Sequence, residues 1–170
     1  MKKNGKKFIS VFICLLLFSF VCFAIGYSMN IDINSNPNLS LGFWDVLSNN
    51  LKVNIMAILY AILSVGIYSL IYLAKEMFFL GVIIKSLKNT HSLFYAISFI
   101  GCHGIIEIPS MVLSGTIGIY VWINIIAYLK KKEFDFKFTI TMFVVLLSMI
   151  LIAAMVETTI TPWFLKKYVI

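Results

Sequence analysis

The sequence contains no arginine, and only 12% of its 170 residues are charged. A soluble domain carries about 25% charged residues, so this composition excludes an ordinary soluble protein. The three cysteines have no paired spacing, which indicates neither a disulfide framework nor a thiolate metal site. The phosphate-binding motif Gly-x-x-x-x-Gly-Lys-Ser/Thr and the zinc motif His-Glu-x-x-His are also absent. We therefore expect no enzyme activity, no cofactor and no metal ion.

Apolar residues dominate instead, at 61% of the chain with a mean hydropathy of +0.99. Several uncharged runs exceed the roughly 18 residues that a helix needs to cross a bilayer. These runs do not alternate in polarity, as the strands of a membrane barrel would. The prediction is an all-α, polytopic transmembrane helical bundle with about five membrane segments, forming a single integral membrane domain over residues 1–170.

The net charge of +7 does not indicate nucleic-acid binding. All 14 positive residues are lysines, and they lie mainly at the ends of apolar runs, where positive residues set membrane topology. No basic face is left over for a nucleic acid. The expected surroundings are therefore the lipid bilayer and other membrane proteins.

The boundaries of the predicted segments follow the apolar runs and their breaks. Residues 77–88 are too few to span, because a dozen helical residues cover about 18 Å of a core about 30 Å thick. As one helix, residues 91–129 would extend about 58 Å, so the chain is expected to reverse at Gly104 to Pro109. The predicted segments are a first transmembrane helix at 8–27, an external loop at 29–49, a second transmembrane helix at 50–73, an interfacial or re-entrant helix at 77–88, a helical hairpin with arms at 91–107 and 109–129, and a last transmembrane helix at 139–161.

The distribution of lysines predicts the orientation. With a cytoplasmic N-terminus, these segments place eleven lysines inside and only Lys52, Lys166 and Lys167 outside. Positive residues favour the cytoplasmic side. We therefore expect a cytoplasmic N-terminus and an external C-terminus.

Five polar residues lie in the outer half of the bilayer in this topology, and they are expected to form one cluster: Asn50, Asn54, His103, Glu107 and Glu157. Ionisable groups in hydrocarbon are costly unless they are paired or face protein. Three interpretations stay open: a hydrogen-bonded network between helices, a transport or proton-handling site, and metal-dependent hydrolysis.

A second set of residues is assigned to helix breaks and packing. Gly104, Pro109 and Pro162 are expected to break or bend helices. Ser110, Ser114 and Gly118 repeat at a spacing of four, which makes a smooth ridge where a neighbouring helix can approach closely.

The motif His-Gly-Ile-Ile-Glu-Ile-Pro-Ser at 103–110 resembles the signature of the stage II sporulation protein M family. The paired asparagines near Asn50 resemble those at the start of the family's second helix. The segment from Ala153 to Pro162 resembles the family's C-terminal ending Ala-x-x-x-Glu-x-x-x-Thr-Pro. The resemblance implies an integral protein of the bacterial cytoplasmic membrane. It also implies one of two roles: a non-enzymatic scaffold of a multiprotein complex in sporulation, or the permease subunit of an ABC-type exporter or self-protection system, for example for a circular bacteriocin.

These two roles predict different partners. A scaffold binds other membrane proteins, whereas an exporter needs a separate cytoplasmic ATPase, because this chain has no phosphate-binding loop. Residues 77–88 would favour the exporter if they formed a coupling helix on the inner surface. The sequence leaves homo-oligomer formation open.

Overall fold

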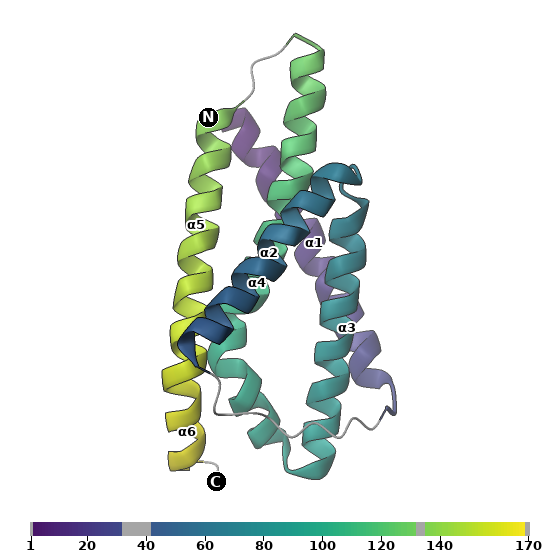
Figure 1. Cartoon of the computed structure of the whole chain (residues 1–170). Helices are drawn as coiled ribbons and strands as arrows, with labels where there is room; N and C mark the ends of the chain where they lie inside the picture. The colour runs from purple at the N-terminus through teal and green to yellow at the C-terminus, as the bar shows by residue number, and fades with distance from the viewer. Residues whose placement is uncertain (1, 32–41, 132–134, 169–170) are drawn as a thin grey trace.

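The computed structural model describes residues 2–31, 42–131 and 135–168 (Figure 1). Every regular element in these residues is a helix, and five helices are long and apolar enough to cross a membrane. The predicted all-α, multi-pass bundle is thereby confirmed. The elements in chain order are α1 (Lys2–Ser28), α2 (Phe43–Leu63), α3 (Ile67–Thr90), α4 (Leu93–Leu129), α5 (Phe136–Met155), the π-helix η1 (Val156–Ile160) and α6 (Thr161–Tyr168).

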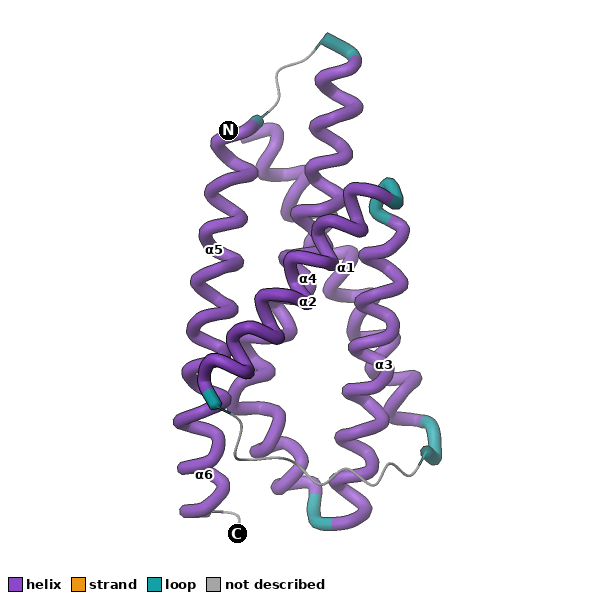
Figure 2. The backbone as a smooth tube through the Cα atoms, in the orientation of Figure 1, coloured by secondary structure: helices purple, strands orange, loops and turns teal. Residues whose placement is uncertain are grey.

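Helices α3 and α5 run along the bundle, α2 crosses it obliquely, and α5, η1 and α6 follow one another without a gap (Figure 1). The start of α1, the turn between α2 and α3, and the start of α5 lie toward one end of the bundle. The end of α1, the turn between α3 and α4, and the end of α6 lie toward the other (Figure 2). The two termini are therefore at opposite ends.

The turn after α2 corrects the predicted second transmembrane helix at 50–73. Val65 and Gly66 both have positive φ, at 57° and 87°, and these left-handed residues end α2. The Gly66 amide donates to the Ala61 carbonyl at 2.7 Å, a hydrogen bond typical of a glycine-terminated helix. Hydropathy did not reveal this end, because the residues on both sides of the turn are apolar.

The predicted interfacial helix at 77–88 is wrong for the same reason. These residues belong to α3, whose 24 residues are enough to span a bilayer. Lys75 and Glu76, which lie between the two predicted segments, are inside α3 and form an ion pair at 3.3 Å. The predicted loop at 29–49 is also too long, since α2 begins at Phe43; residues 32–41 lie outside the described residues.

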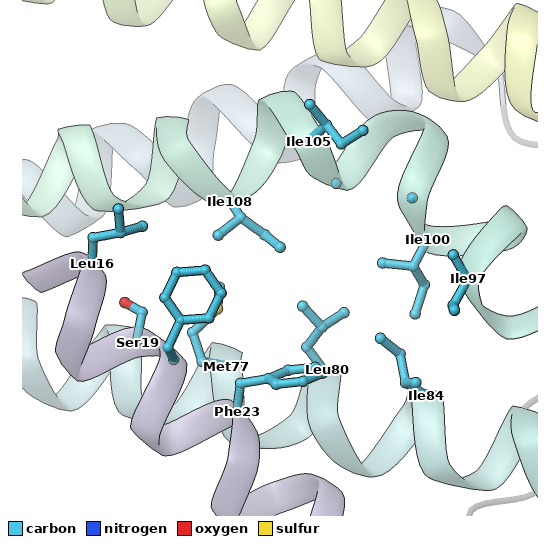
Figure 3. Close-up of a pocket in the computed structure, with 13 residues that line it drawn as sticks. Leu16, Ser19, Phe23, Met77, Leu80, Ile84, Ile97, Ile100, Ile105 and Ile108 are labelled. Carbon is cyan, nitrogen blue, oxygen red and sulfur yellow. The ribbon is translucent and has the colours of Figure 1, made fainter. Parts of the chain in front are cut away.

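The predicted hairpin at 91–107 and 109–129 is also wrong. A single 37-residue helix, α4, runs through Pro109. A proline removes one backbone donor from a helix, and transmembrane helices tolerate that loss when nearby groups compensate. Figure 3 shows α4 changing direction between Ile105 and Ile100 rather than reversing, in the stretch that holds Gly101 and Gly104. The part of α4 that is apolar and long enough to cross is Gly104–Leu129.

Two glycines bring α1 and α3 into backbone contact. A Cβ atom at Gly26 would lie against the Phe78 carbonyl, only 2.8 Å from its carbon. A Cβ at Gly81 would lie 2.6 Å from the Tyr27 amide nitrogen. Small residues at a helix crossing allow this close approach, which maximises van der Waals contact where lipid supplies no hydrophobic driving force.

Candidate functional site

The π-helix η1 positions Glu157 at the point where α5 passes α2 and α4. Pro162, in the first turn of α6, has no amide hydrogen, and its ring would clash with the carbonyl four residues earlier in a regular helix. The backbone widens instead, so the Thr161 amide donates to the Val156 carbonyl five residues earlier. The Thr161 hydroxyl donates to the same carbonyl at 3.3 Å. The widened turn places Glu157 on the bundle, and such π-turns are frequent at functional sites.

Glu107 is the centre of an acidic group inside the bundle. Its carboxylate lies close enough to those of Glu157 and Glu76 for their charges to interact. Tyr72, one helical turn before Glu76 on α3, lies within the same range of Glu107. We call these four residues the acidic group. Its members come from α3, α4 and η1.

A cavity of about 240 Å³ opens beside this group, between α3 and α4. Glu76 and Glu107 contribute its carboxylates, and apolar side chains such as Met77, Leu80 and Met111 form the rest of its wall. Within the part of the chain that the structure describes, no three His, Cys, Asp or Glu side chains are arranged to hold a metal ion. The chemistry on offer is that of carboxylates and a phenol in an apolar surrounding, which can accept hydrogen bonds, protons or cationic groups.

The asparagines of the predicted cluster form hydrogen bonds along their own helix. The Asn54 amide nitrogen donates to the Asn50 carbonyl at 2.9 Å. Asn54 is only 2% exposed. Its side-chain oxygen Oδ1 and the side-chain nitrogen Nδ2 of Asn50 have no hydrogen-bond partner in the described residues. The His103 side chain lies outside the described residues, so its pairing with Glu107 stays a prediction.

The predicted packing residues lie in the interior. Ser110 and Ser114 are buried and donate to the carbonyls of Glu107 and Met111, both at 2.7 Å. Their hydroxyls are thus satisfied within α4. Gly118 lies against Ala61, and a Cβ there would also be 3.3 Å from the Ile58 carbonyl.

Two of the other assigned residues border cavities. Gly104 borders the cavity beside Glu76 and Glu107, and it also borders a second, apolar cavity, which is drawn in Figure 3. Pro109 lines a separate cavity near the start of α1.

Several residues that the sequence analysis missed also join helices. The Ser69 hydroxyl donates to the Gly115 carbonyl at 3.2 Å, between α3 and α4. The Trp122 indole donates to the Ile62 carbonyl, between α4 and α2. Tyr72 and Glu76 would have been recognised as intramembrane polar residues if Gly66 had been read as the end of a helix.

Known proteins share most of this sequence region. The family model described as Stage II sporulation protein M matches residues 8–162. The chain belongs to this family. The resemblance seen at 103–110 is thereby confirmed. The chain is also similar to "Uncharacterized protein MJ0793" of Methanocaldococcus jannaschii, with 33% identity over 136 residues, which cover 76% of each chain. No solved structure matches the sequence.

Proposed function

We propose that this member of the stage II sporulation protein M family is a non-enzymatic membrane scaffold, a static subunit that binds other membrane proteins through its outer helix faces. The observation that carries the proposal is the backbone contact between neighbouring helices at Gly26, Gly81 and Gly118. Alternating-access transport needs one group of helices to rock against another. Helices whose backbones touch slide only by breaking those contacts, so this packing favours a static role.

The outer face of α1 is the surface we assign to a partner. Large apolar side chains repeat there at every fourth residue and point away from the bundle, with Leu17 61% exposed. They form a stripe that winds around the helix along its length: Ile9, Ile13, Leu17, Val21 and Ile25. Such a stripe is suited to lipid and equally to a transmembrane helix of another protein.

The exporter interpretation loses its main structural support. It depended on residues 77–88 as a coupling helix on the inner membrane surface, and these residues belong to the membrane-spanning α3.

We also propose that the N-terminus is cytoplasmic. Seven of the described lysines lie at the N-terminal end of the bundle: Lys2, Lys3, Lys6, Lys7, Lys130, Lys131 and Lys137. Four lie at the opposite end: Lys85, Lys88, Lys166 and Lys167. The bias is smaller than the eleven to three of the sequence analysis, because Lys85 and Lys88 change sides, Lys52 and Lys75 lie within α2 and α3, and Lys132 lies outside the described residues. It keeps the same direction, and positive residues favour the cytoplasm.

Photo-crosslinking in native membranes tests the scaffold. A photoreactive amino acid at Leu17 is expected to give one discrete protein adduct, because this position lies on the outer stripe. The same amino acid at Leu73, which is fully buried, is the matched control and is expected to crosslink only within the chain. If position 17 and the other four stripe positions all yield only lipid adducts, the assigned surface is wrong.

A disulfide lock separates a static scaffold from a moving transporter. The Ser69 Cβ lies 3.4 Å from the place of a Cβ at Gly115, close to the separation of about 3.8 Å in disulfides. Ser69→Cys with Gly115→Cys, in a chain without its native cysteines, should therefore join α3 to α4 on oxidation. The yield of the protein crosslink from position 17 is expected to be the same with the disulfide closed or open. Complementation of a deletion strain is also expected to be the same in both states. Loss of either on oxidation, reversed by a reductant, would contradict the scaffold.

A further inference from the structure

A second cavity, also about 240 Å³, lies between α1, α3 and α4 on the other side of Leu80 and Ile108 (Figure 3). Its wall is almost wholly apolar. Phe23 from α1, Leu80 and Ile84 from α3, and Ile97 from α4 lie around it in Figure 3. Because the cavity is formed by helices that cross the membrane, hydrocarbon chains surround it.

A basic and aromatic group lies within one helical turn of two residues that line this cavity, Phe23 and Ile84. Phe23 stacks on Tyr27, one turn further along α1, with ring centroids 6.3 Å apart. Lys85 follows Ile84 directly on α3, and its ammonium lies 5.4 Å from the centre of the Tyr27 ring. Lys88, one turn beyond Ile84, donates to the Tyr27 hydroxyl at 3.3 Å. The apolar lining is thus followed, within one helical turn on α1 and on α3, by Tyr27 and two positive charges.

Lys85 and Lys88 both carry a positive charge at this point. Neither forms an ion pair with a carboxylate within residues 2–31, 42–131 and 135–168. Both lie near the end of α3, where the helix reaches the bilayer surface, and tyrosine is enriched at this depth. The crossing at Gly26 and Gly81 fixes α1 and α3 next to this point, so Tyr27 and the lysines are held together.

We propose that this cavity binds one anionic phospholipid, with an acyl chain between α1, α3 and α4 and the phosphate at Lys85, Lys88 and Tyr27. The apolar wall recognises hydrocarbon, and the two ammonium groups with the phenol recognise a phosphate. Basic pockets between transmembrane helices bind anionic lipid head groups by the same chemistry. The site is separate from the proposed partner surface on α1, because Phe23 and Tyr27 are not part of the outer stripe.

Lipid binding to the purified full-length protein tests the proposal. Native mass spectrometry in detergent would measure the affinity for dioleoyl phosphatidylglycerol and for the zwitterionic dioleoyl phosphatidylcholine. The wild type should prefer phosphatidylglycerol. Lys85→Gln with Lys88→Gln should weaken its binding roughly 30-fold, since each basic residue near an anionic lipid contributes about a factor of five. Lys166→Gln with Lys167→Gln is the matched control at the same end of the bundle, and its effect should be under about threefold.

Two further variants test whether the acyl chain is bound in the cavity and whether the positive charges alone explain the effect of the glutamine variant. Leu80→Phe narrows the cavity but leaves both lysines, so it should weaken phosphatidylglycerol and leave any binding of inorganic phosphate unchanged. Lys85→Arg with Lys88→Arg keeps both charges and should bind like the wild type even if the glutamine variant folds poorly. Equal loss in both glutamine pairs, equal affinity for the two lipids, or no effect of Leu80→Phe would each overturn the proposal.

Discussion

Tyr120→Ala is expected to destabilise the bundle by about 3 kcal/mol or more, the range for removing a large buried aromatic ring. Tyr120 is only 2% exposed and packs edge-to-face on Phe8 and Phe138, with ring centroids 5.3 Å and 5.5 Å away. Phe8 and Phe138 also pack edge-to-face on each other. The three rings belong to α4, α1 and α5, so the substitution removes the contact that these helices share near the end of the bundle where α1 and α5 begin.

Unfolding of the purified protein in detergent, followed by circular dichroism, measures this loss. Tyr120→Phe is the control, because it keeps the ring and all three edge-to-face contacts, and it should cost less than about 1 kcal/mol. Equal stability of the alanine and phenylalanine variants would show that the aromatic contact does not hold these helices together.

Gly81→Ala should separate α1 from α3 and cost about 2 kcal/mol, within the range for overpacking a close contact. Alanine normally stabilises a helix relative to glycine by about 1 kcal/mol, so the clash must exceed that gain. It does so here because the new Cβ meets backbone atoms of Phe23 and Tyr27 on α1, which cannot rotate away. Detergent unfolding of the variant gives the size of the effect.

Gly101→Ala is the matched control for this glycine. Its Cβ would meet only a methyl group of Ile97 at 3.8 Å, an ordinary contact. The gain in helix propensity should then appear as unchanged or higher stability. Unchanged stability of the Gly81→Ala variant would contradict the close backbone contact between α1 and α3. Both the static scaffold and the geometry of the lipid site depend on that contact.

Composition and hydropathy alone predicted the class of fold, because a bilayer requires long uncharged helices whatever their detailed packing. The boundary between α2 and α3 was missed because one left-handed turn at Val65 and Gly66 leaves no trace in hydropathy. That single error made α3 an interfacial helix and hid Glu76 and Tyr72 from the candidate site. A glycine within an apolar run was the available signal.

Pro109 shows a different limit of sequence reasoning. The local rule that proline ends a helix was applied to α4, but the helix continues, because it loses only one backbone hydrogen bond. Among the candidate residues, Glu107 and Glu157 lie within range for their charges to interact, whereas the Asn54 side chain bonds along α2. The contact of Gly26 and Gly81 with the facing helix was beyond prediction, since the two are far apart in the sequence and only the crossing of α1 with α3 brings them together.

The most direct test of the account is the topology of α3, because the partner surface, the orientation and the lipid site all require α3 to cross the membrane. Single cysteines at Val65 and at Asn89, at its two ends, would be probed in intact cells with a membrane-impermeant thiol reagent, in a chain without its native cysteines. The account predicts labelling at position 89 in intact cells, and at position 65 only after the cells are opened. Labelling of both positions from the same side would contradict it.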